Sequence, residues 1–409
     1  KSMKKIVQAW TGISLVQRIV AGLVIGALLG MFVPSEGGIA ILGDVFVGAL
    51  KAIAPLLVFF LVISSLCYAG ASHGGVIRTV IIMYMFSTFL AAIVAVAASS
   101  AFPVTLTLVD AATDMAAPQG VAEVLRTLLM NVVTNPVQSL VSANYIGILV
   151  WAVLIGIALR RASDTTKQSL NDISAALSKT VTWIIQCAPF GIMGLVYNTV
   201  SVNGLSTFTE YGKLLAVLLG SMLFIYFVTN PILVFWCIRK NPYPLIFKCL
   251  KKSAITAFFT RSSAANIPIN MEACAEMGLD KDTYSVTIPL GATINMDGAA
   301  ITITVMTMAT AFTLGIHVDI PTAIILSLLA ALSACGASGV AGGSLLLIPM
   351  ACSLFGISDN ISMQVVAVGF IIGVIQDSVE TALNSSSDLL LSASAEFRQW
   401  RLEGKEIKF

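Results

Sequence analysis

Long apolar stretches, separated by short polar segments, make up most of the chain. A membrane-spanning helix needs roughly 20 mostly apolar residues. By this criterion the pattern predicts eight spans, at residues 13–33, 39–67, 76–103, 141–160, 177–200, 212–238, 283–313 and 360–391. The sequence therefore predicts an all-α protein with eight transmembrane helices in a lipid bilayer.

Two further apolar segments, residues 243–276 and 321–356, do not fit as spans. The first is interrupted by a polar tip at 261–266 and the second by a glycine-rich tip at 336–344. Each arm has about 12–15 residues, which is too few to cross a bilayer. Irregular backbone at membrane depth is tolerated only inside protein or along a watery cavity. We therefore expect two re-entrant helical hairpins; the alternative is that the glycines only permit close helix packing.

Basic residues in the loops set the expected orientation. They cluster before the first predicted span and after the fourth, sixth and eighth, whereas the other connections carry acidic residues. The positive-inside rule then places both termini in the cytoplasm. The two hairpins enter from opposite sides, and each precedes a helix with polar residues. This arrangement is the inverted-repeat pattern of secondary transporters.

Composition removes several other classes of protein. Hydrophobic residues make up 57% of the chain and charged residues 11%, whereas soluble domains carry about 25% charge. The net charge of +2 is too balanced for a nucleic-acid binder. There is no P-loop, and Ser262 and Ser263 have no histidine or lysine base at motif spacing, so we expect neither ATP hydrolysis nor nucleophilic catalysis. The expected protein is a transporter or a channel, and not an enzyme.

Carboxylates inside the last two spans are the strongest functional signal. Asp297 lies in the apolar penultimate span, where a charge costs at least about 2.5–3.5 kcal/mol. In the final span, one narrow helical stripe carries polar residues at offsets of 0, 4, 7 and 11, namely Asp377, Thr381, Asn384 and Asp388. Glu380 lies beside this stripe. Oxygen-only ligands of this kind suit an alkali cation.

The third span carries a smaller polar group. Tyr84, Ser87 and Thr88 share one face of the predicted helix. Alone the group is weak evidence for a site, because hydroxyls in membrane helices commonly bond to a neighbouring helix or to the carbonyl four residues earlier.

Four motifs occur in order along the chain. They are R-S-S-A-A-N-I-P from residue 261, N-M-D-G from 295, C-G-A-S-G-V-A-G-G-S from 335 and D-x-x-E-T-x-x-N-x-x-x-D from 377. Together they resemble the dicarboxylate/amino acid:cation symporters, the glutamate-transporter family, and the resemblance covers essentially the whole chain. The chain is most similar to the bacterial sodium:serine/threonine symporters of that family.

The resemblance implies a homotrimer in the bacterial inner membrane that works by an elevator type of alternating access. The scaffold would comprise helices 1–2 (residues 1–75) and helices 4–5 (residues 104–211). The mobile transport domain would comprise helix 3 (residues 76–103) and residues 212–409, which hold both hairpins and the last helices.

The resemblance also implies the site residues. Asp377 would bind the substrate amino group and Asn384 its α-carboxylate, and the full substrate set is Ser263, the backbone at Val340, Asp377, Glu380, Thr381 and Asn384. A first Na⁺ site would use Gly291, Asn295, Asn384 and Asp388. A second would use backbone around Thr293 and the second hairpin, near Met296. A third would use Tyr84, Ser87, Thr88, Asn295 and Asp297.

Departures from the family pattern point to the substrate. Glu380 stands where relatives for acidic substrates have an arginine, and Ala299 stands where they have a threonine. We therefore expect Na⁺-coupled import of small neutral L-amino acids, serine and threonine first. The alternatives are a sodium- or proton-coupled symporter for another small amino acid or a dicarboxylate, or an ion channel. Arg261 is the expected partner of Glu380, unless Glu380 is protonated.

Overall fold

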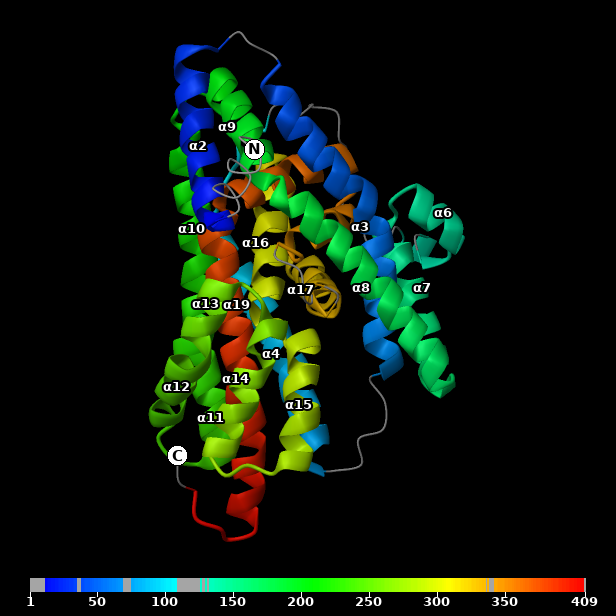
Figure 1. Ribbon diagram of the computed structural model, residues 1–409, viewed down its shortest axis with the longest axis vertical. Coiled ribbons are helices and arrows are strands. Elements are labelled where there is room, and N and C mark those ends of the chain that lie inside the picture. The colour runs from blue at the N-terminus through cyan, green and yellow to red at the C-terminus, as the bar shows by residue number, and fades with distance from the viewer. Residues whose placement is uncertain are drawn as a thin grey trace, which may run out of the picture.

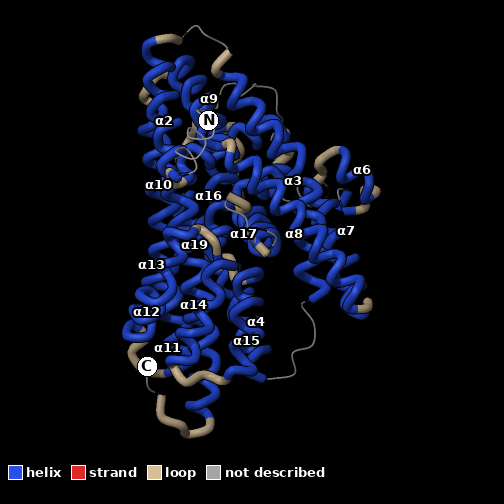
Figure 2. The backbone as a smooth tube through the Cα atoms, viewed as in Figure 1, coloured by secondary structure: helices blue, strands red, loops and turns tan. Residues whose placement is uncertain are grey.

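The computed structural model of the protein describes residues 12–34, 38–68, 75–108, 126, 129–130, 132–335, 337 and 342–407. This part of the chain is helical and contains no strand (Figure 2). Its α-helices are α2 (Leu15–Phe32), α3 (Ala40–Tyr68), α4 (Gly75–Ala101), α6 (Pro136–Val141), α7 (Tyr145–Ala158), α8 (Asp164–Gln186), α9 (Ala188–Asn203), α10 (Thr207–Phe224), α11 (Asn230–Ile238), α12 (Tyr243–Cys249), α13 (Ile255–Thr260), α14 (Ser263–Glu276), α15 (Lys281–Ile294), α16 (Asp297–Thr313), α17 (Ile320–Ala334), α18 (Ile348–Ser353) and α19 (Asp359–Leu402). The expected all-α fold class is confirmed.

Six helical segments within the described residues are long and apolar enough to cross a membrane. They are Leu15–Phe32, Ala40–Ser64, Gly75–Ala101, Thr207–Ile238, Lys281–Thr313 and Asp359–Leu402. Each coincides with one of the predicted spans. The protein is therefore a multi-pass membrane protein. The predicted span at 141–160 corresponds to α7, which has 14 residues, and a 3₁₀ turn at Leu159–Arg161.

The predicted span at 177–200 is sharply bent in the structure. The chain there forms two helices, α8 and α9, which meet at an angle of 55°. Cys187 ends α8, and Pro189 occupies the first turn of α9. Proline has no N–H to continue the ladder of a preceding helix, but it is favoured where a helix begins. Helix α9 then packs against α2, while α8 lies along α3 (Figure 1).

Glycines allow α2 to approach α9 closely. An added Cβ at Gly22 would lie 2.2 Å from the carbonyl oxygen of Pro189, and one at Gly26 would lie 2.4 Å from that of Met193. Both obstructing atoms belong to backbone, so no side chain can rotate to make room. This one-turn spacing of small residues is typical of tightly packed membrane helices.

We predict that Gly26→Ala destabilises the protein by about 1–3 kcal/mol, the usual cost of overpacking. The measurement is thermal unfolding in detergent. Gly48→Ala is the matched control, because a Cβ at Gly48 on α3 would meet no atom within 4 Å and alanine favours the helix. An equal melting temperature for the two variants would contradict the close contact.

At the position of the first predicted hairpin, two helical arms are joined by a tight turn. The first arm runs through α12, a π-helix at Leu250–Ala254 and α13, and the second is α14. Only Arg261 and Ser262 leave the helices: Arg261 has a left-handed φ of 52°, and Ser262 caps α14 by accepting a hydrogen bond from the Ala265 N–H. The polar tip is therefore shorter than predicted. The second hairpin comprises α17 and α18, and residues 336 and 338–341 of its tip lie outside the described residues.

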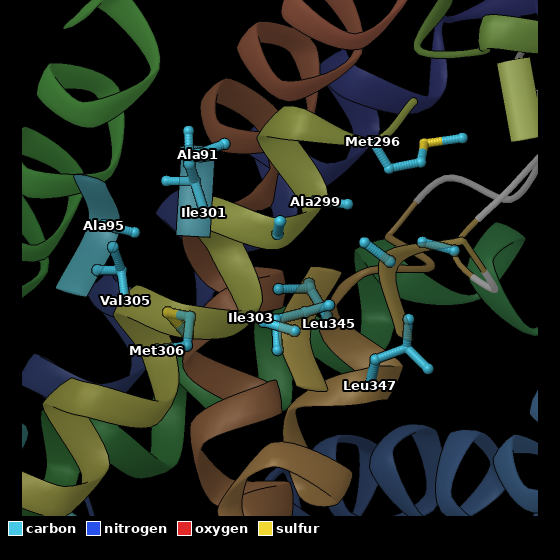
Figure 3. Packing of buried hydrophobic residues seen from close by; sticks show 14 of the residues in the cluster. Ala91, Ala95, Met296, Ala299, Ile301, Ile303, Val305, Met306, Leu345 and Leu347 are labelled. Atoms are coloured by element: carbon cyan, nitrogen blue, oxygen red, sulfur yellow. The ribbon is translucent and has the colours of Figure 1, made fainter. Parts of the chain in front are cut away.

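Helices α16 and α19 form the centre of the molecule (Figure 1). Fifteen consecutive residues of α16, from Asp297 to Ala311, are buried. Alanines on α4 let α16 pack closely: Ala91 and Ala95 lie against Ile301 and Val305 (Figure 3). This close packing fixes the height of α16 relative to α4, and with it the polar residues one turn earlier on both helices.

Candidate functional site

The penultimate span is broken at its middle. Helix α15 ends at Ile294, and α16 begins at Asp297. Between them Asn295 and Met296 have non-helical backbone, with ψ angles of 84° and 54°. A broken helix at membrane depth places helix ends and free backbone groups next to the chain segments that pack on it, which is typical of ion and substrate sites in transporters.

Asp297 is completely buried where α4, α16 and α19 meet. Its Oδ2 accepts hydrogen bonds from the hydroxyls of Ser87, at 2.8 Å, and Ser387, at 3.0 Å. Its Oδ1 accepts one from Thr88 at 3.2 Å. The structure therefore brings Asp297 together with two of the predicted hydroxyls of the third span, Ser87 and Thr88.

A second buried carboxylate belongs to Asp388, the residue of α19 that follows Ser387. Its Oδ1 accepts a hydrogen bond of 2.8 Å from Asn295 Nδ2. Within the described part of the chain, Asp388 Oδ2 and Asn295 Oδ1 are buried and have no hydrogen-bond partner. Buried acceptors without a partner are rare in native proteins, and an ion is one of the accepted explanations. A Cβ at Gly291 would lie 2.9 Å from this carboxylate, so glycine keeps the space beside it open.

The residues predicted for the third cation site do not all contact Asp297; some contact Asp388 instead. Ser87 and Thr88 contact Asp297. The Tyr84 hydroxyl instead donates to the backbone oxygen of Asp388, at 2.9 Å. Asn295 is likewise bonded to Asp388 and not to Asp297.

Asp377 is paired with the tip of the first hairpin. The Nε and Nη2 atoms of Arg261 both lie 2.7 Å from Asp377 Oδ2. From the second hairpin, the Gly342 N–H donates to Asp377 Oδ1 at 3.4 Å. Asp377 therefore joins the two hairpins.

The expected pairing of Arg261 with Glu380 is wrong. Glu380 Oε2 already accepts hydrogen bonds from Thr302, at 2.7 Å, Ser344, at 2.9 Å, and Gln376, at 2.5 Å. These three neutral donors come from α16, the second hairpin and α19, so Glu380 lies in a polar cradle that does not include Arg261.

The remaining predicted substrate residues lie between these groups. Asn384 Oδ1 accepts the Gly298 N–H at 2.7 Å, and its Nδ2 is 3.5 Å from Met296 Sδ. The Thr381 hydroxyl donates to the backbone oxygen of Asp377 at 2.8 Å.

Two more of the predicted residues, Ser263 and Thr293, are described by the structure. Ser263 is buried in the first turn of α14 at the first hairpin tip, and the Thr293 hydroxyl donates to the Leu290 carbonyl. Val340 lies outside the described residues.

Several buried residues of the site were not among the predicted site residues. They are Asn230, Thr302, Ser344, Gln376 and Ser387, which supply hydrogen bonds to Asp297, to Glu380 or to the hydroxyls beside them. Gln376 lies four residues before Glu380, so its contact follows helical spacing. The others come from segments distant in the sequence, and only the fold brings them to the site.

Comparison with known proteins gives a consistent family. The model of the sodium:dicarboxylate symporter family matches residues 15–396. A serine/threonine transporter (SstT) of Bifidobacterium adolescentis is 55% identical over 408 residues, covering 100% of this chain and 95% of its own. Proteins of the same name from Streptococcus thermophilus and Streptococcus agalactiae are 56% identical, over 98% and 96% of this chain and 100% and 98% of theirs. The chain belongs to the sodium:dicarboxylate symporter family.

Proposed function

We propose that this protein is a Na⁺-coupled symporter that imports serine and threonine. The observation that carries the proposal is the pair of buried, unpartnered oxygens, Asn295 Oδ1 and Asp388 Oδ2, beside the break in the penultimate span. The high identity to proteins named serine/threonine transporter supports the choice of substrate.

The two buried carboxylates are proposed as Na⁺ sites, because carboxylate, hydroxyl and amide oxygens are the hard ligands that suit an alkali cation. Asp388 would bind one Na⁺ with Asn295, Asn384 and the Gly291 carbonyl, and Asp297 another with the hydroxyls around it. The backbone near Thr293 and Met296 would serve a further ion. One charge moving inward across 100 mV provides about 2.3 kcal/mol, and a tenfold Na⁺ gradient adds about 1.4. This energy drives uptake of a neutral amino acid against its gradient.

For the substrate, we propose that the ammonium group binds Asp377 in place of Arg261. The pair holds Asp377 neutralised without substrate, and a substrate ammonium offers the same charge to the same oxygens. Asn384, Ser263, Thr381 and the second hairpin backbone near Val340 would complete the site. A charge-assisted hydrogen bond of this kind contributes roughly 1.5–3 kcal/mol.

Because Arg261 would compete with the substrate for Asp377, we predict that removing the Arg261 side chain strengthens serine binding. Arg261→Ala leaves the carboxylate of Asp377 without its competing cation, so serine should bind at least threefold more tightly at saturating Na⁺. The measurement is the serine Kd by calorimetry in detergent. Lys252→Ala is the control, because it removes an exposed salt bridge to Glu276 on the same hairpin and should leave Kd unchanged. Weaker serine binding by Arg261→Ala would mean that Arg261 helps to hold the substrate.

The assembly follows as part of the proposal. Helices α2, α3 and α7–α9 pack on one another and form the proposed scaffold, whereas α4 and α10–α19 surround the site and form the proposed transport domain (Figure 1). We propose a homotrimer in the inner membrane, with both termini in the cytoplasm and an elevator movement of the transport domain.

Uptake of labelled serine into proteoliposomes tests the function. We expect accumulation with an inward Na⁺ gradient, none without it, and competition by unlabelled threonine. A saturating current that does not need Na⁺ would favour a channel, and a chemically altered product would favour an enzyme.

A further inference from the structure

Asn230 occupies an irregular point of the sixth span. A π-helix at Ile225–Thr229 precedes it, so the Asn230 N–H bonds to the Ile225 carbonyl, five residues back. Pro231 follows and has no N–H to give to the Phe227 carbonyl, which instead accepts a hydrogen bond of 3.1 Å from the Tyr243 hydroxyl. Single π turns are frequent at functional sites. Here the extra residue in the turn directs Asn230 inward, where it is completely buried.

The Asn230 side chain lies directly behind the hydroxyls that bind Asp297. Its Nδ2 donates to Ser387 Oγ at 3.0 Å. Its Oδ1 lies 3.5 Å from Ser87 Oγ. Asn230, Ser87, Ser387 and Asp297 come from four separate helical segments, α11, α4, α19 and α16, and each is at most 1% exposed.

The chemistry of the amide fixes where the hydroxyl protons go. Because Nδ2 can only donate, Ser387 Oγ must accept from it, and the Ser387 proton remains directed to Asp297 Oδ2. Ser87 has two acceptors within reach, Asp297 Oδ2 at 2.8 Å and Asn230 Oδ1 at 3.5 Å. A cation at Asp297 repels the hydroxyl proton of Ser87. The Ser87 hydroxyl can then rotate and donate its hydrogen bond to Asn230 Oδ1. In this orientation a lone pair of the Ser87 oxygen faces the ion.

We propose that Asn230 is a positioning residue of the Asp297 cation site, whose amide orients the hydroxyls of Ser87 and Ser387 for Na⁺. The inference rests on the proposed Na⁺ coupling. Partners behind the direct ligands typically change metal affinity by 10–100-fold when removed.

The test is a Na⁺ titration of serine uptake in proteoliposomes with full-length variants. Asn230→Leu should raise the Na⁺ concentration for half-maximal uptake at least tenfold, while the serine KM at saturating Na⁺ changes less than twofold. Asn270→Leu is the matched control: Asn270 is equally buried and also donates to a serine of α19, Ser385, but it does not reach Asp297. Its Na⁺ requirement should stay within twofold of the unmodified protein.

Ser387→Ala is a smaller change, and it tests the same network if Asn230→Leu does not fold. It should raise the Na⁺ requirement as well, and the double variant should show less than the product of the two single effects, because both act on one network. An unchanged Na⁺ requirement in Ser387→Ala, equal behaviour of Asn230→Leu and Asn270→Leu, or multiplicative effects would overturn the inference. Uptake by the unmodified protein that needs no Na⁺ would instead overturn the proposed function.

Discussion

Replacing Asp388 with asparagine is expected to raise the Na⁺ concentration for half-maximal serine uptake at least tenfold. The substitution keeps the size of the side chain and one oxygen that can accept from Asn295, but it removes the charge. At 4 Å and an effective dielectric of 20, a unit charge pair is worth about 4 kcal/mol, so the loss can exceed tenfold by a wide margin. The measurement is serine uptake into proteoliposomes over a series of Na⁺ concentrations at constant ionic strength.

Asp319→Asn provides the matched control for this change. Asp319 caps α17 by accepting the Thr322 N–H at 2.9 Å, and hydrogen bonds from Thr322 lower the pKa of Asp319. Asparagine caps helices about as well as aspartate, so the control removes one carboxylate charge outside the site and should not alter Na⁺ dependence. The same Na⁺ requirement for Asp388→Asn and the unmodified protein would remove Asp388 from the ion site.

Aspartate is expected to compete poorly with serine, and Glu380→Gln should make it a much better competitor. A charged Glu380 at about 4 Å from a substrate carboxylate repels it by about 4 kcal/mol at an effective dielectric of 20, which is close to a thousandfold in affinity. Glutamine removes the charge, and its carbonyl oxygen can still accept from Thr302 and Ser344. The measurement is the aspartate inhibition constant for serine uptake in both proteins.

Threonine separates a charge effect from general damage to the site. Its KM should change far less than the aspartate inhibition constant in Glu380→Gln, because a hydroxyl has no charge to repel. Equal inhibition of the unmodified protein by excess aspartate and by threonine would refute the role of Glu380 in excluding acidic substrates.

The fold could be predicted where hydropathy alone decides it. The predicted spans 13–33 and 76–103 correspond to Leu15–Phe32 and Gly75–Ala101. Hydropathy carries no information on the direction of a helix axis, so the bend of 55° between α8 and α9 was not predictable from it. Pro189 marked the position, but proline both ends and begins helices, and only packing of α9 on α2 shows which occurred.

The site could be predicted where its residues share one helix. The stripe from Asp377 to Asp388 follows from helical spacing, and all its members are buried in α19. Spacing cannot state which oxygen faces which donor on another helix, and for this reason the expected partner of Arg261 was Glu380 instead of Asp377. Asn230 and Thr302 were missed for the same reason, since Asn230 is an isolated amide in an apolar helix and Thr302 is one of five threonines spread along α16.

The cradle around Glu380 also constrains how substrate charge changes during evolution. Thr302, Ser344 and Gln376 all donate to one oxygen of Glu380, and arginine is a donor without an acceptor. A single Glu380→Arg replacement would therefore remove the shared acceptor and require the Thr302 and Ser344 hydroxyls and the Gln376 amide to turn their oxygens toward the guanidinium. This cost precedes any gain in binding an acidic substrate. A lineage moving between neutral and acidic substrates is expected to pass through glutamine at this position, or to change residues of α16 and the second hairpin first. The hydrogen bonding of one side chain thus restricts the order of substitutions, and reconstructed intermediates that carry Glu380→Arg without those changes should be inactive toward both kinds of substrate.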